Sequence, residues 1–226
     1  MFLDKYYLLL VVPTLLISLW AQMKVKTTFS KYEKVLSRRG MSADSAVRRI
    51  LDANGLQNVR IERISGHLTD HFDPRTNVVR LSDSVYGSSS VASIGVAAHE
   101  AGHAVQHAVG YLPIKLRAAV LPVANFGSRI SIPLIILGIV LSYGILIDIG
   151  IILFSAAVAF QLITLPVEFN ASRRAISVLE NGFLDSEEVK GAKSVLTSAA
   201  LTYVAAALTS VAQLLRLILI SKNRRR

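Results

Sequence analysis

The hydrophobic residues of this chain gather in long runs rather than at the spacing of a soluble core. The first run, Tyr6–Gln22, carries no charge, and the second, Ile130–Val167, carries only Asp148. One helix over the second run would far exceed the ~30 Å hydrocarbon core at ~1.5 Å per residue, so we expect two spans that turn near residues 142–150. The last run, Ser194–Ile220, completes four predicted membrane-spanning helices.

An even number of spans places both termini on one side of the membrane and residues 23–129 and 168–193 on the other. These two regions carry most of the juxtamembrane lysine and arginine residues, which favours the cytoplasm for them. The basic tail at residues 222–226 favours the opposite orientation. Arg216 lies near enough to the end of its run to reach the membrane surface.

The chain between the first two runs has the pattern of a small α+β unit. The predicted elements are a helix that starts after Ser42 and ends at Asn54–Gly55, a strand at 58–64, a hairpin of 66–72 and 77–82, and a helix over 91–109 closed by Gly110. Ser42 and Ser88–Ser90 are placed to cap the two helices. Asp73 and Pro74 are typical turn residues, because Pro presets φ and Asp can bond back to the backbone.

The composition of the 226 residues removes several classes of function. With no cysteine, the chain has no disulfide framework, thiolate zinc finger or cysteine nucleophile. The net charge is +10, but the basic excess lies beside the hydrophobic runs, where attraction to anionic lipid explains it. No nucleic-acid-binding module is recognisable. Asp148 alone is too little for a transporter, and Gly87–Val91 lacks the G-x-S-x-G pattern of a serine hydrolase.

The residues that decide the chemistry are His99, Glu100 and His103 in the sequence HEAGH. Residues four apart lie on one face of a helix, so both imidazoles can bind one ion at about 2.1 Å. Glu100 can then accept a proton from water on that ion, whose pKa zinc lowers. Chance gives roughly 0.003 such motifs in a chain of this composition, which disfavours two merely hydrogen-bonded histidines.

A catalytic zinc ion needs a third protein ligand and an open position. On a straight helix His107 lies about 12 Å from His99, too far for both to bind one ion, so we expect it to support the site or to pack in the core. Glu168 is the best acidic candidate, because a carboxylate at the end of a span is costly unless it is paired or metal-bound. A solvated glutamate at the interface is the competing interpretation.

Three sequence blocks resemble the YugP-like family of bacterial membrane zinc metallopeptidases, which are gluzincins: GHLTDHFDP at 66–74, AAHEAGHAVQH at 97–107 and LPVEFNAS at 165–172. With the apolar segment Ala199–Ala207, the resemblance covers nearly the whole chain. It implies that the zinc ligands are His99, His103 and Glu168 and that the general base is Glu100. HtpX-like chains carry an Asp where this chain has Ser172, so the partner of the zinc histidines is left open.

In gluzincin-like sites an edge strand pairs with an extended peptide substrate. Asn77–Ser82 or Gly66–His71 could be that edge. The candidates for stabilising the oxyanion or binding substrate are His67, His71, Arg173 and Arg174, each with a surface or salt-bridged role as the competing interpretation. Asp70, His71 and Asp73 could also hold a second metal, although turn capping explains Asp73 better.

These observations together predict an α-helical integral membrane protein with about four transmembrane helices and a small α+β zincin-like (minigluzincin) catalytic unit. The expected regions are a first transmembrane helix (1–22), a catalytic region with its active-site helix at 90–109 (23–129), a transmembrane hairpin (130–167), a segment with the third zinc ligand (168–193), and a fourth transmembrane helix with a basic tail (194–226).

The predicted function is that of a membrane-embedded metalloendopeptidase with one catalytic Zn²⁺, which cleaves membrane or membrane-proximal proteins with water activated by Glu100. The competing interpretation is a catalytically silent zinc-binding membrane scaffold or adaptor, although metal binding alone does not require Glu100. The expected partners are the lipid bilayer and a peptide or membrane-protein substrate, with no nucleic acid. The expected location is a bacterial cell membrane, with the site on the cytoplasmic side favoured.

Overall fold

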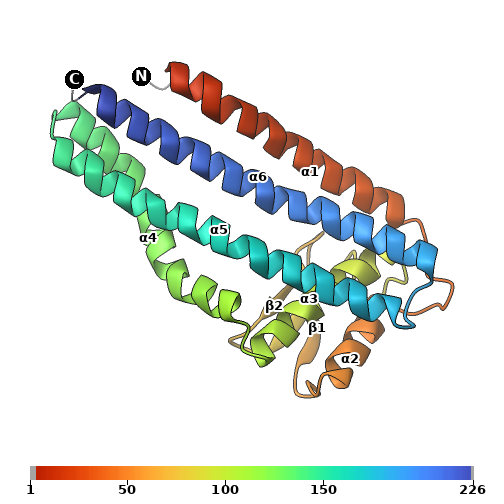
Figure 1. The fold of residues 1–226 in the computed structure, drawn as a ribbon. Coiled ribbons are helices and arrows are strands. Elements are labelled where there is room, and N and C mark those ends of the chain that lie inside the picture. Colours follow the sequence, from red (N-terminus) through yellow and green to blue (C-terminus); the bar gives the residue numbers. More distant parts are fainter. Residues whose placement is uncertain (1–3, 225–226) are drawn as a thin grey trace. The chain divides into compact units, whose positions relative to one another are not determined.

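The computed structural model describes residues 4–224, most of them in helices. The helices are the π-helical turn η1 (Tyr7–Val11), α1 (Val12–Tyr32), α2 (Ala43–Ala53), α3 (Val91–Ala108), α4 (Leu112–Val140), α5 (Gly144–Glu180) and α6 (Ser186–Arg224). The strands are β1 (Arg60–Ile64), β2 (His71–Asp73) and β3 (Val78–Ser82). Four stretches are long and apolar enough to cross a membrane: 7–32, 112–140, 144–180 and 186–223 (Figure 1). The predicted fold class is therefore confirmed.

The membrane helices extend well beyond the hydrophobic runs that predicted them. α4 begins at Leu112 rather than near Ile130, and α5 continues to Glu180. These two helices have 29 and 37 residues, where two short spans were expected. The turn between them lies at residues 141–143, at the beginning of the predicted turn region. The runs mark only the lipid-compatible part of each helix, because helical hydrogen bonding propagates cheaply into the polar sequence that follows.

The chain forms two compact units. One combines residues 23–111 with 167–200 and contains the sheet, α2 and α3, and the other combines 112–166 with the residues up to 22 and from 201 onward. In the second unit, a side chain at Gly127 would collide with the backbone of Leu153. The glycine therefore lets α4 and α5 approach closely, as small residues do between membrane helices.

Arg216, which was expected to reach the membrane surface, is buried and paired with an acidic residue. Its side chain donates two hydrogen bonds to the carboxylate of Asp4, at 2.9 and 2.6 Å. Only 9% of Arg216 is exposed, and its guanidinium also lies over the ring of Tyr7. The pairing has a clear reason, because an uncompensated buried charge is strongly destabilising.

The sheet has the order β1-β3-β2, which corrects one prediction. The hairpin is confirmed, because β2 pairs antiparallel with β3, with Phe72 opposite Val79. β1 pairs parallel with the other side of β3. The candidate edge Asn77–Ser82 is thus the central strand. The edge strand of the hairpin is β2, which contains only His71 of the other candidate edge, Gly66–His71. Hairpin signals in a sequence specify only one neighbour of each strand, and a parallel neighbour gives no local signal.

Small residues on α3 bring the functional elements together within their unit. A Cβ atom on Gly102 would lie 2.8 Å from the backbone oxygen of Ala171 in α5, and one on Gly95 would lie 3.3 Å from the side chain of Ala192 in α6. The predicted cap at Ser90 is confirmed, since its hydroxyl accepts a hydrogen bond from the N–H of Ser93. α3 is therefore fixed at its start and packs tightly against α5.

Ser42 is the N-cap residue of α2 by position, but its hydroxyl makes no capping bond to the backbone. It donates instead to the hydroxyl of Ser45 at 2.8 Å. α2 is held mainly by its apolar face, which packs in the same core as α3 and includes Val47, Ile50 and Leu51. Burial of this face outweighs the missing cap bond, because most of the stability of a short helix comes from tertiary packing.

Candidate metal centre

α3 and α5 bring three potential metal ligands to one point. The Nε2 atoms of His99 and His103 lie 3.1 Å apart, one helical turn from each other on α3. An oxygen of Glu168, on α5, lies 3.3 Å from the first and 3.5 Å from the second. Glu168 is only 2% exposed, and both imidazoles are largely buried. Among the described residues, these three form the one group of His, Asp and Glu side chains suited to a shared ion.

The separations of these three atoms suit zinc. A tetrahedral zinc ion with bonds of about 2.1 Å holds its ligand atoms about 3.4 Å apart. The observed separations of 3.1 to 3.5 Å lie close to that value. Two imidazoles and a carboxylate also form a donor set that zinc commonly takes, with one coordination position left for water or substrate. The residues present therefore fit a zinc ion.

Gln106 fixes the orientation and the tautomer of His103. This glutamine is fully buried, and its Nε2 donates to the backbone oxygen of Val167 at 2.8 Å and to Oδ1 of Asn170 at 3.0 Å. Its other amide atom, Oε1, is an acceptor and lies 3.0 Å from Nδ1 of His103. Nδ1 must then carry the proton, which leaves the lone pair on Nε2 directed at the candidate metal position.

Ser172 is the partner of the other histidine. Its hydroxyl lies 3.1 Å from Nδ1 of His99, and it stands one helical turn after Glu168 on α5. The serine that replaces the aspartate of HtpX-like chains thus occupies the position from which a side chain can accept the Nδ1 proton. A neutral hydroxyl accepts a hydrogen bond more weakly than a carboxylate does. Ser172 can therefore orient the His99 ring, but it adds no negative charge beside it.

Negative charge gathers around the two histidines. Burial lowers the pKa of His103, but its hydrogen bond to Glu168 and the charges of Glu100 and Glu168 outweigh burial and raise that pKa above its usual value of 6.5. The charges that favour a proton on the imidazole equally favour a metal cation at its free nitrogen. The electrostatics of the centre and its geometry therefore point to the same kind of occupant.

Glu100 is held against the edge strand of the sheet. The residue is 9% exposed, and its carboxylate accepts a hydrogen bond of 3.0 Å from the backbone N–H of Phe72, the middle residue of β2. Nearby Asp70 anchors the start of this strand by accepting bonds from the N–H and the hydroxyl of Ser82, at 2.7 and 2.9 Å. The carboxylate proposed as general base is thus ordered from the strand rather than from its own helix.

Comparison with known proteins agrees with this centre. The family model described as "Putative neutral zinc metallopeptidase" matches residues 7–222. "Putative membrane protease YugP" of Bacillus subtilis (strain 168) is 50% identical over 220 residues, which cover 97% of this chain and 98% of that protein. The chain belongs to this zinc metallopeptidase family. No solved structure matches it significantly.

Membership in the family confirms the resemblance drawn from the three sequence blocks, and the family model covers the four candidate spans almost completely. Together with the apolar helices, it identifies the chain as an integral membrane protein. The candidate ligand Glu168 lies in α5, which is itself one of the four long apolar helices. The candidate metal centre thus takes one of its three residues from a long apolar helix.

The predicted oxyanion and substrate residues lie outside the three-residue group. His67 is exposed and contacts the ring of Phe29 edge to face, with the ring centres 5.6 Å apart. His71 is in β2, and its Nδ1 bonds to the backbone oxygen of Thr69. Arg173 is exposed, whereas Arg174 is half-buried and donates from Nε to Asn170. Their roles toward substrate stay predictions.

One expectation about the other metal-type residues is wrong, and a second metal site, named only as a possibility, has no support among the described residues. His107 neither packs in the core nor supports the histidine pair by a hydrogen bond, since it is exposed and contacts the ring of Phe72 with centres 5.9 Å apart. A second metal group at Asp70, His71 and Asp73 is not found among residues 4–224. Asp73 instead caps the turn through the N–H of residue 75 and the side chains of residues 76 and 80.

The sequence interpretation missed Gln106, Asn170 and the backbone N–H of Phe72. Gln106 had a usable signal, because it lies three residues after His103 and therefore on the same helical face. Asn170 lies two residues after Glu168, a spacing that places it on a different face and gives no such signal. The bond from Phe72 to Glu100 depends on how the sheet docks on α3, which no local pattern specifies.

Proposed function

We propose that this protein is a membrane-embedded zinc-dependent endopeptidase. The observation that carries the proposal is the set of three donor atoms from His99, His103 and Glu168, which lie 3.1 to 3.5 Å apart. The two histidines are on α3, which also carries Glu100, and Glu168 comes from α5. Membership in the metallopeptidase family supports the same function. One Zn²⁺ is the proposed ion, held by the two imidazoles and the carboxylate.

A zinc ion held by His99, His103 and Glu168 would supply a Lewis acid able to acidify water and polarise the scissile carbonyl. Glu100 takes a proton from the attacking water at its carboxylate and later delivers it to the leaving amine nitrogen. Gln106 and Ser172 keep the two imidazoles directed at the metal. Glu168 and both imidazoles are largely buried, and their low exposure to solvent strengthens the electrostatic interactions between them.

The proposed substrates are peptide segments of membrane or membrane-proximal proteins. β2 is a sheet edge beside Glu100, which accepts the N–H of Phe72. An extended peptide can add to such an edge through the main-chain groups that Glu100 does not occupy. Main-chain pairing makes weak demands on sequence, so the enzyme should select substrates by position and unfolded conformation. The proposed location is a bacterial cell membrane, with residues 23–111 on the cytoplasmic side.

The test is the Glu100→Gln variant, which keeps the shape of the side chain and removes its basicity. The purified variant should bind zinc as the wild type does and should cleave no unfolded membrane-protein substrate. Undiminished cleavage would contradict the mechanism. Stoichiometric zinc without turnover in the wild-type protein, across a broad peptide library, would favour the alternative of a silent zinc-binding scaffold.

A further inference from the structure

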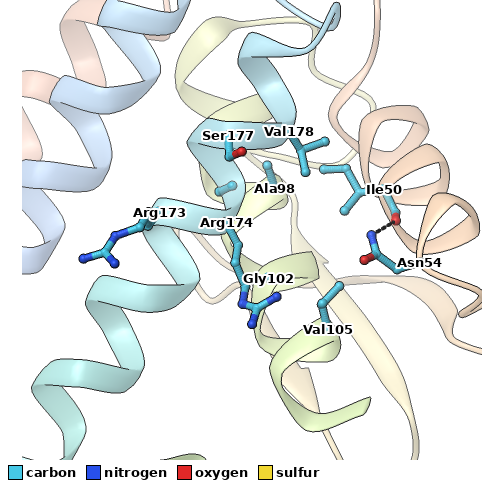
Figure 2. A pocket seen from close by; sticks show the side chains of 10 residues that line it. Ile50, Asn54, Ala98, Gly102, Val105, Arg173, Arg174, Ser177 and Val178 are labelled. Atoms are coloured by element: carbon cyan, nitrogen blue, oxygen red, sulfur yellow. Dashed lines mark hydrogen bonds between the residues drawn. The ribbon is translucent and has the colours of Figure 1, made fainter. Parts of the chain in front are cut away.

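A cavity of about 320 Å³ lies beside the metal centre, between α2, α3 and α5. It is lined by a neighbouring face of α3, with Gly102 and Val105, rather than by the face that carries the two histidines. Ile50 of α2 and Val178 of α5 give it further apolar walls (Figure 2). Its volume is at the lower end of the range for small-molecule sites.

The charge of this cavity comes from arginine, and no acidic residue lines it. Figure 2 shows Arg174 extending from α5 toward Gly102 and Val105, whereas Arg173, which also lines the cavity, extends from the other side of the helix. Of the three guanidinium nitrogens of Arg174, only Nε makes a hydrogen bond to a described residue, and it donates this bond to Asn170. Within residues 4–224 its two terminal nitrogens make no hydrogen bond or ion pair, so they are available to an anion.

A second polar group faces the same space. Asn54 at the end of α2 donates from Nδ2 to the backbone oxygen of Ile50 at 2.7 Å, and this bond fixes the amide. Its Oδ1 makes no hydrogen bond within the described part of the chain and faces the cavity in Figure 2. The cavity therefore combines a cationic fork, one acceptor and aliphatic walls.

We propose that this cavity binds the C-terminal residue of an apolar peptide. The guanidinium of Arg174 pairs with the terminal carboxylate, because its planar fork matches two carboxylate oxygens. Oδ1 of Asn54 accepts the N–H of the same residue, and the aliphatic side chain lies against Ile50, Val105 and Val178. The biological ligand rests on the proposed function, since endopeptidase cleavage releases new peptide C-termini.

A chain of hydrogen bonds connects this cavity with the metal centre. Nε of Arg174 donates to Oδ1 of Asn170 at 2.8 Å, and the same oxygen accepts from Nε2 of Gln106 at 3.0 Å. Gln106 in turn holds Nδ1 of His103. A carboxylate on Arg174 orders this chain and neutralises a positive charge close to the metal, and both effects favour a bound cation. Peptide and zinc should therefore strengthen each other's binding by the same factor.

The binding test uses the full-length protein in detergent, loaded with zinc, and titration calorimetry with N-acetyl-L-leucine. Its uncharged amide, N-acetyl-L-leucinamide, is the matched control ligand and should bind at least about tenfold more weakly. Arg174→Gln should weaken binding of the acid roughly 10- to 100-fold. Arg75→Gln removes the same charge from an exposed residue outside the cavity lining and should change binding by less than about twofold.

Equal binding of acid and amide, an equal loss in both variants, or no binding to the wild type would overturn the proposal. The comparison of acid with amide in the unmodified protein keeps the test valid even if Arg174→Gln unfolds. The coupling is tested by chelator competition for zinc, in which N-acetyl-L-leucine should raise zinc affinity roughly fivefold. Unchanged zinc affinity with the ligand bound would overturn the connection to His103.

These measurements are independent of proteolysis. A protein that binds the acid through Arg174 but cleaves no peptide would contradict the proposed function and support this site. A protein that cleaves peptides but binds acid and amide alike would contradict this site and leave the proposed function standing.

Discussion

Replacing Gln106 with leucine tests whether this buried side chain holds the metal centre together. The substitution keeps roughly the same volume and removes three hydrogen bonds, at 3.0, 2.8 and 3.0 Å, to His103, Val167 and Asn170. Because Gln106 is fully buried, water cannot replace these bonds. At a net value of about 1 kcal/mol each, their loss should lower the free energy of unfolding by about 3 kcal/mol.

The metal readout is more specific than the stability readout. Without an acceptor at Nδ1, His103 can rotate or carry its proton on Nε2, which is the nitrogen that faces Glu168. Loss of such a supporting partner typically lowers metal affinity about 10- to 100-fold. Zinc affinity is measured by competition with a chromogenic chelator, and stability by denaturant unfolding of the metal-free protein in detergent.

Gln106→Glu is the matched control for this prediction. It retains an acceptor for Nδ1 of His103 but cannot donate to Val167 or Asn170, so it should lose stability and retain zinc affinity better than Gln106→Leu. The reasoning would be refuted if Gln106→Leu lost stability yet bound zinc as tightly as the wild type. In that case Gln106 would join α3 to α5 without directing the histidine.

Two further predictions concern the packing of α3 and the anchor of β2. Gly102→Ala places a Cβ atom 2.8 Å from the backbone oxygen of Ala171, so overpacking of about 1–3 kcal/mol should separate α3 from α5 and weaken zinc binding. Gly144→Ala, where nothing lies within 4 Å, should leave zinc affinity unchanged, and an equal effect of both substitutions would contradict the packing argument. Burial raises the pKa of Asp70 above 3.8, although hydrogen bonds from Ser82 oppose the shift. The folded chain then binds this proton more tightly than the unfolded chain, so the contribution of Asp70 to stability falls as the pH rises through 3.8 to the higher folded value. Asp70→Asn should flatten this part of the pH dependence in unfolding titrations from about pH 4 to about pH 7, and an unchanged slope would show that another group causes it.

The sequence alone determined the features that depend on near neighbours in the chain. Apolar runs marked four membrane helices, because a span needs about 20 consecutive lipid-compatible residues. The spacing of His99 and His103 placed both imidazoles on one helical face, and the chemistry of that pair singled out Glu100. Glu168 was selected by the cost of a carboxylate at the end of a span, and the structure places its oxygen within 3.5 Å of both imidazole nitrogens.

Only the tertiary structure decided the features that depend on long-range packing. It placed β3 at the centre of the sheet, paired Arg216 with Asp4, and supplied Gln106 and Ser172 as partners of the two histidines. Most of these contacts join residues far apart in sequence, and their geometry is set by how closely whole helices and strands approach. The periodicity of apolar residues shows which face of a helix or strand is buried. It does not show which other helix or strand packs against that face, because this is decided when the whole core assembles.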